Sequence, residues 1–157
     1  ALAALSPEIK GANFDSGHNL FHAANCAKCH RLGSEGGAIG PDLSTAGRKF
    51  SLPDLMDAML EPSKAISDQY GSQQLQLSDG RSLVGRVVEI GDELHIYTTD
   101  ANAAAIVVKK ADVEEMKVSP ISQMPLGCVD ALNQQELKDL VAYILSAGDR
   151  NAKVFKP

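Results

Sequence analysis

The stretch HAANCAKCHRLGSEGGAIGPDLS, residues 22–44, places Cys26, Cys29 and His30 within five positions and then continues into glycines. Two residues between the thiols set a spacing at which each thiol can add to one of the two vinyl groups of a haem, and the next histidine can direct its imidazole at the iron. The motif therefore predicts one haem c, attached covalently through Cys26 and Cys29, with His30 as the proximal iron ligand.

Two other chemistries also use closely spaced cysteines. A thioredoxin-like redox pair follows a strand of a βαβ unit, whereas residues 15–25 here have the pattern of a helix. A zinc site needs a fourth ligand and usually a second Cys or His pair, but His18, His22 and His95 are scattered and Cys128 stands alone. Haem attachment is the favoured interpretation, and the redox and zinc sites are the alternatives.

A haem held by His30 either has a sixth ligand or leaves that position open. A methionine thioether is the usual partner in electron transfer, because it favours ferrous iron and raises the potential. Met56 and Met59 belong to a helical apolar pattern and are expected in the core. Met116 lies in a segment that reads as a strand or strand end, and it is the second candidate.

Met124 is the predicted sixth ligand. It lies in the loop SPISQMPLG, between prolines and before a glycine, where no periodic apolar face demands a methionine for packing. The alternative is a second histidine: His18 and His22 are four positions apart and share one helix face. Both stand so close to His30 in sequence that reaching the opposite face of a haem is awkward.

The elements that must position these residues fall into three stretches. The first holds a helix ahead of the haem motif, a glycine-rich turn and a helix near residues 52–60, with capping-box spacing between Ser51 and Asp54. The clearest helix covers residues 130–147, where Asn133 and Glu136 have the same spacing. Between them, residues 73–118 are rich in β-branched residues and broken by turn signals, and they predict four or five short strands in a meander.

Several motifs occur in an order that resembles the cytochrome c haem-binding domain of planctomycete and verrucomicrobial bacteria. They are Cys26-Ala-Lys-Cys29-His30, Gly40-Pro41-Asp42-Leu43, Glu61-Pro62-Ser63, Ser78-Asp79-Gly80 with Gly85, Ser122-Gln-Met124-Pro125-Leu-Gly127, and ELKDLVAYI. The resemblance covers roughly residues 14–156. It implies a mainly α cytochrome c fold with an inserted small antiparallel β-sheet, α+β overall: a single domain over residues 1–157 with the insertion at 73–118.

The resemblance also implies roles for smaller features. A carbonyl at Pro41 would accept the proton of the proximal imidazole, although a plain turn proline is equally expected. Arg48 could pair with a haem propionate, and a solvated arginine is at least as good an interpretation. Such domains often form the C-terminal part of a longer protein, so a redox protein or a fused dehydrogenase domain is the expected partner. Cys128 departs from the family pattern, and its neighbours Leu126, Val129 and Leu132 suggest that it is buried.

The ligand set predicts function. A haem capped on both faces by His30 and Met124 has no free position for oxygen or peroxide, so it passes single electrons through its exposed edge and is not an enzyme. The alternative is a haem enzyme or a gas or redox sensor with an open or labile sixth position. An enzyme would need a distal acid or base, and none is obvious near Met124.

Composition narrows the partners and the compartment. The 157 residues carry 20 acidic against 15 basic side chains, a net charge of −5, which disfavours nucleic acid and anionic membranes. No window is long and apolar enough for a membrane span. Covalent haem attachment takes place outside the bacterial cytoplasmic membrane, so the motif implies a periplasmic or otherwise exported protein.

Overall fold

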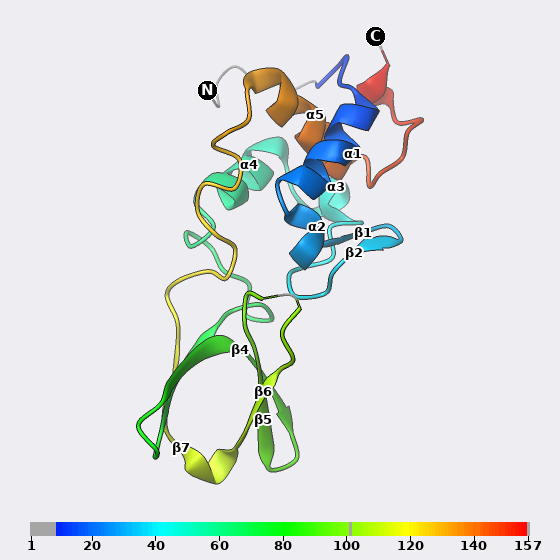
Figure 1. Ribbon diagram of the computed structural model, residues 1–157. Coiled ribbons are helices and arrows are strands. Elements are labelled where there is room, and N and C mark those ends of the chain that lie inside the picture. Colours follow the sequence, from blue (N-terminus) through cyan, green and yellow to red (C-terminus); the bar gives the residue numbers. More distant parts are fainter. Residues whose placement is uncertain (1–8, 101, 157) are drawn as a thin grey trace. The chain divides into compact units, whose positions relative to one another are not determined.

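The computed structural model describes residues 9–100 and 102–156, and the chain divides into two compact units (Figure 1). The helical unit comprises the described parts of Ala1–Glu61 and Leu126–Pro157, and the sheet unit those of Pro62–Pro125. Helices and a five-stranded antiparallel sheet together give a mixed α+β class. The expected insertion at residues 73–118 lies inside the sheet unit, and the single domain stays a prediction.

The helical unit contains the haem-motif residues. Its elements are α1 (Phe14–Ala23), α2 (Cys26–Cys29), the hairpin β1 (Arg31–Leu32) and β2 (Glu35–Gly36), α3 (Ala46–Lys49), α4 (Leu52–Leu60), α5 (Gln134–Leu145) and the 3₁₀ turn η3 (Lys153–Phe155). The predicted core role of Met56 and Met59 in α4 is confirmed, because both side chains are buried.

Reciprocal side-chain caps fix the first residues of α4 and α5. The predicted capping box of Ser51 and Asp54 is present at α4. At α5 the Asn133 N–H donates to the Glu136 carboxylate at 2.9 Å, and the Glu136 N–H donates to the Asn133 side chain at 3.0 Å. Because Asn133 is the capping residue, the helix begins at Gln134 rather than at residue 130, which corrects the predicted boundary.

α1 packs directly on α5, where Gly17 makes the close approach possible (Figure 1). A Cβ at Gly17 would overlap the backbone carbonyl of Asp139 on α5. The buried Asp139 carboxylate also accepts the N–H of Asn13 at 2.9 Å, and Asn13 in turn caps the first turn of α1. Backbone contact and a partly buried hydrogen bond therefore fix the start of α1 against α5.

The sheet unit contains five strands. They are β3 (Gln73–Leu77), β4 (Ser82–Ile90), β5 (Glu93–Tyr97), β6 (Ile106–Lys109) and β7 (Val113–Val118), with the 3₁₀ turn η2 (Lys110–Asp112) between the last two. The order across the sheet is β6-β5-β4-β3-β7, antiparallel throughout. The predicted strands at residues 73–118 are therefore confirmed.

The predicted meander holds from β3 to β6 and is wrong for β7. That strand pairs with β3 at the opposite edge from β6, although only η2 separates β6 and β7 in sequence. Three residues bridge little distance, so the sheet has to curl until its two edges approach each other (Figure 1). The sheet unit is thus a partly closed barrel.

A core of its own fills the curled sheet. Its inward-facing aliphatic residues alternate along the strands, as a half-buried strand requires. Those that are buried are Leu75, Leu77, Leu94, Ile96 and Val108, and those packed against them and partly buried are Leu83, Val87, Ile106 and Val113. The sheet unit therefore has a hydrophobic core of its own.

This core generates a stability prediction. Ile96→Ala removes a fully buried side chain from the centre of the cluster, so we expect the free energy of unfolding to fall by about 2–5 kcal/mol. The matched control is Val107→Ala, on the neighbouring strand but 49% exposed, which should cost no more than about 0.5 kcal/mol. Urea unfolding followed by far-ultraviolet circular dichroism measures both, and equal losses would contradict the assigned core.

Candidate functional site

The haem-motif residues lie on one short helix that follows α1 after a sharp reversal. Asn25, between the two helices, has a left-handed backbone with φ of 62°, a conformation that asparagine tolerates better than most residues. α2 then runs from Cys26 to Cys29, and the N–H of His30 donates to the Cys26 carbonyl at 2.8 Å. Both cysteines and the histidine therefore belong to one closed turn of backbone.

The glycine-rich segment after the motif is bonded back onto that turn. Two of its backbone N–H groups donate to carbonyl oxygens of α2, Gly37 to Ala27 at 2.9 Å and Gly40 to Cys29 at 2.8 Å, and Leu43 donates to the carbonyl of Arg31 in β1 at 2.8 Å. The first two bonds satisfy carbonyl groups that a four-residue helix leaves free at its C-terminal end. These hydrogen bonds hold residues 37–43 beside His30.

The imidazole of His30 is oriented by this segment, through Gly40 and Pro41. Its Nδ1 lies 2.8 Å from the carbonyl oxygen of Pro41, so Nδ1 carries the proton and donates it. The ring also lies flat against Gly40, where a Cβ would stand 2.8 Å from the His30 Cε1 atom. The tautomer leaves the Nε2 lone pair free, which is the state that a histidine needs in order to bind a metal.

Burial governs the ionisation of the site. It lowers the pKa of His30, and the hydrogen bond to Pro41 opposes that shift, so the neutral ring is favoured. Burial also raises the pKa of the Cys26 thiol to about 11, and the nearby Cys128 adds to the effect. Burial raises the pKa of Cys29 too, against the opposing charge of Lys28. Burial therefore favours the uncharged forms of His30, Cys26 and Cys29.

The residues present fit a covalently attached haem. Cys26 and Cys29 are free and partly buried, and a thioether at either position would carry no charge into surroundings that disfavour a thiolate. His30 offers a fixed, neutral ring with Nε2 unengaged. Haem would supply a one-electron iron couple at this position.

The helical unit also contains the candidate site residues Arg48, His18 and His22. Arg48 lies exposed in the last turn of α3, so its pairing with a propionate stays a prediction. His18 and His22 both direct Nε2 at the Glu35 carboxylate of β2, at 3.1 and 3.0 Å. No sequence pattern places Glu35 beside the two histidines, although their four-residue spacing indicates that they share one helix face.

Met124 belongs to the sheet unit, and its loop is held by hydrogen bonds of residues 122–124. The Met124 N–H donates to the Ser122 hydroxyl at 3.1 Å, and the Ser122 N–H donates to the Ser63 hydroxyl at 3.0 Å. The Gln123 amide donates to the Tyr97 carbonyl at 3.0 Å. Met124 is therefore on an ordered loop rather than in a helix or strand, as its sequence predicted, and its role as an iron ligand stays a prediction.

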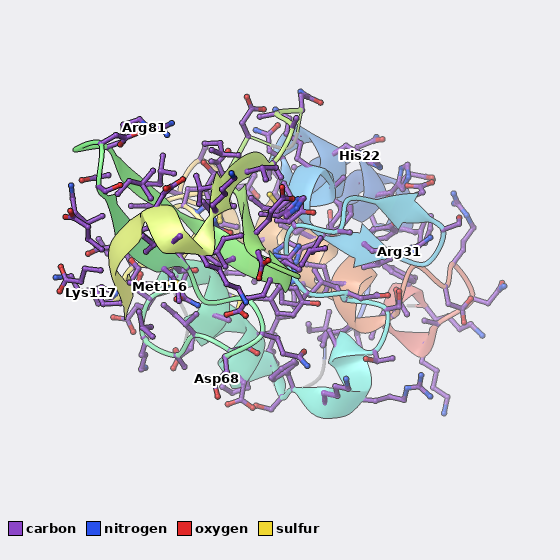
Figure 2. The ribbon with its side chains drawn as sticks, turned by 90° about the horizontal axis from the view of Figure 1, so that it is seen from below. His22, Arg31, Asp68, Arg81, Met116 and Lys117 are labelled. Carbon is purple, nitrogen blue, oxygen red and sulfur yellow. The ribbon has the colours of Figure 1, made fainter. Side chains whose placement is uncertain are left out.

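Packing and surface exposure are enough to explain the position of Met116, without a role in iron binding. It lies on β7, opposite Leu75 of β3, and its side chain is 42% exposed (Figure 2). The prediction that this segment forms a strand is confirmed.

Comparison with known families agrees with the chemistry of the site. The family model described as Cytochrome c matches residues 14–81, which include the whole CxxCH turn and Pro41. No curated protein matches the chain. The match supports a c-type cytochrome, and with it haem c, iron binding, redox activity and electron transport.

The same family match bears on activity and compartment at a general level. Cytochrome c proteins are generally electron-transfer proteins rather than enzymes, and their domains are usually exported or periplasmic. Among the described helices, none has the length and apolar character to cross a membrane.

The contact between Gly40 and His30 can be tested by adding one methyl group. Gly40→Ala would push a Cβ into the imidazole, and such overpacking costs about 1–3 kcal/mol of unfolding free energy. The control is Gly71→Ala, whose Cβ would have its nearest neighbour, the Ser67 carbonyl oxygen, at 3.7 Å, so stability should change by less than about 1 kcal/mol. Urea unfolding compares the two, and equal effects would contradict the tight contact.

The free thiol of Cys128 gives a second prediction. Its Sγ lies 3.9 Å from the Met59 carbonyl oxygen, the residue is partly buried, and burial raises its pKa. Since the thiolate is the reactive form, labelling by a maleimide at pH 8 should be slow in the folded protein, faster as the pH rises above 9, and fast in urea. Mass spectrometry of the labelled peptide follows the residue. Equal rates in the folded and unfolded protein would place the thiol on the surface. Of the apolar neighbours that suggested burial of Cys128, Val129 is buried, whereas Leu126 is 75% exposed.

Proposed function

We propose that this protein transfers single electrons through one haem c, attached by Cys26 and Cys29 and ligated by His30 and Met124. The observation that carries the proposal is the His30 imidazole, held by the Pro41 carbonyl with its Nε2 free. The match of residues 14–81 to the Cytochrome c family supports it.

The protein's own part in electron transfer is to keep the iron's surroundings the same in both oxidation states. The hydrogen bond from His30 to Pro41 fixes the ring orientation and makes the imidazole a better donor. Gly40 and the bonded segment behind it prevent the ring from rotating. A ligand that does not move when the charge on the iron changes contributes little reorganisation to each transfer.

Met124 completes the proposal as the sixth ligand. Its loop is fixed by the serine and glutamine hydrogen bonds and by Pro125, whose ring restricts one backbone angle. An ordered loop has already lost the entropy that ligation would otherwise cost. A thioether in this position favours ferrous iron and keeps the potential higher than a histidine or water ligand would.

The proposal extends to partner and compartment. We infer an exported protein, since cysteine-attached haem is made outside the bacterial cytoplasmic membrane. A redox protein, or a dehydrogenase domain in the same polypeptide, would donate the electrons. The small sheet unit is proposed as an insertion in the cytochrome c fold that carries the methionine loop.

Alanine substitutions at Met124 and at Met116 test which methionine ligates the iron. Met124→Ala should open the sixth position, so the iron binds cyanide or carbon monoxide, the weak red band of iron–sulfur ligation disappears and the potential falls within the roughly 0.8 V range that axial ligands span. The control is Met116→Ala, which removes an exposed methionine from β7 and should leave the spectrum and potential unchanged.

Each outcome has a distinct meaning. If Met116→Ala and not Met124→Ala opened the iron, the ligand would be Met116 and electron transfer would stand. If neither variant changed the spectrum and the unaltered protein bound carbon monoxide, the sixth position would be open. The protein would then be a haem enzyme or a gas sensor.

A further inference from the structure

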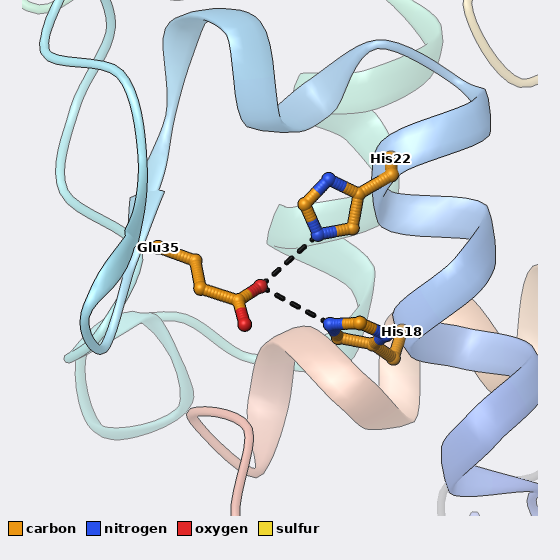
Figure 3. A group of neighbouring side chains, drawn as sticks. All are labelled: His18, His22 and Glu35. Carbon is orange, nitrogen blue, oxygen red and sulfur yellow. Dashed lines mark hydrogen bonds and ion pairs between the residues drawn. The ribbon is translucent and has the colours of Figure 1, made fainter.

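A second group of metal-binding side chains lies on the helical unit, outside the haem motif. His18 and His22 of α1 and Glu35 of β2 converge so that both imidazole Nε2 atoms contact the same carboxylate oxygen, at 3.1 and 3.0 Å (Figure 3). The three donor atoms all lie within 4.8 Å of one another. None of these residues has a part in the proposed electron transfer.

The spacing of the donors suits a small tetrahedral cation. Zinc holds histidine nitrogen and carboxylate oxygen at about 2.0–2.2 Å, which places neighbouring ligands of a tetrahedron about 3.3 Å apart. The two nitrogen–oxygen distances are already within a few tenths of an ångström of that separation. Since all three donor atoms lie within 4.8 Å of one another, side-chain rotation is the adjustment that an ion would require of them.

The ligand types select the class of ion. Two imidazoles and one carboxylate suit zinc and its transition-metal neighbours, whereas magnesium and calcium prefer sites made of oxygen. The histidines are also four residues apart on one helix, an arrangement that presents two nitrogens to one point without strain. Three protein ligands leave the fourth position of a tetrahedron to a water molecule.

The surroundings hold the donors in place. The His18 ring contacts Tyr143 of α5 edge-on, with centroids 5.5 Å apart, and it contacts His22 at 4.9 Å. Glu35 stands opposite the buried Leu32 in the β1–β2 hairpin, so its position follows from the hairpin register. The His18 side chain is 35% exposed, and those of His22 and Glu35 are 47% exposed, so an ion can reach them from solvent.

We propose that His18, His22 and Glu35 form a surface site for a divalent cation of the zinc class. The site is independent of the haem proposal. Glu35 replaces its two hydrogen bonds to imidazole by one bond to the ion, and both histidines bind through Nε2 once the protons of those hydrogen bonds have moved to Nδ1 or to solvent. The ion joins α1 to the β1–β2 hairpin, which are the elements on either side of the haem-motif turn.

Calorimetric titration of the haem-loaded protein with zinc chloride tests the site. We expect one zinc ion per chain and an unchanged visible spectrum, which separates this site from the haem iron. His22→Gln and Glu35→Gln should each weaken zinc binding by at least about tenfold, the lower end of the loss caused by removing even an outer-shell partner. Magnesium chloride in excess should not compete.

A matched control comes from the sheet unit. His95 lies 3.4 Å from the Glu93 carboxylate, a histidine–glutamate pair without a second histidine. His95→Gln should leave the zinc affinity unchanged. Equal weakening by His95→Gln and His22→Gln, a titration with no saturable one-to-one heat, or affinity that persists in the double variant His18→Gln/His22→Gln would overturn the proposal. Circular dichroism of each variant checks that it is folded.

Discussion

The orientation of one imidazole ring is the constraint on which the proposed site depends. His30 has a proton acceptor on one side, the Pro41 carbonyl, and a backbone without a side chain on its face, at Gly40. Neither contact would exist if residues 37–43 were free to move, and three backbone hydrogen bonds, two to the haem-motif turn and one to β1, hold them. The glycines are therefore structural partners of the histidine. Their role is to bring main chain to a distance that any side chain would prevent.

The sheet unit holds the loop that contains Met124 in an ordered conformation. Its core is built from alternating aliphatic residues and is filled without help from a cofactor. On that foundation, residues 122–124 find hydrogen-bond partners in Ser63 and Tyr97, at the start and middle of the same unit. A thioether offered from such a loop needs no further ordering. The folding of the sheet offsets the loss of entropy that ordering the loop requires.

Local sequence signals were enough for the features with local causes. The CxxCH spacing, the capping boxes at Ser51 and Asn133, and the strands between residues 73 and 118 each depend on neighbours within a few positions. The pairing of β7 with β3 does not, because strand alternation shows which face is inward and not which strand lies beside it. The approach of Glu35 to His18 and His22 likewise depends on how a hairpin packs, and exposed polar residues carry no pattern that reports it.

The contact between α1 and α5 has a consequence for the order in which the chain can fold. Asn13 and Asp139 are 126 positions apart, and among the described residues α5 is the long helix against which α1 packs. Contacts of such high sequence separation form late, because closing a long loop costs entropy before it is rewarded. The segment that leads into the two cysteines therefore remains without its packing partner until α5 has reached α1. In a chain that is exported before it folds, the thiols would be most accessible to a haem-attaching enzyme during that interval.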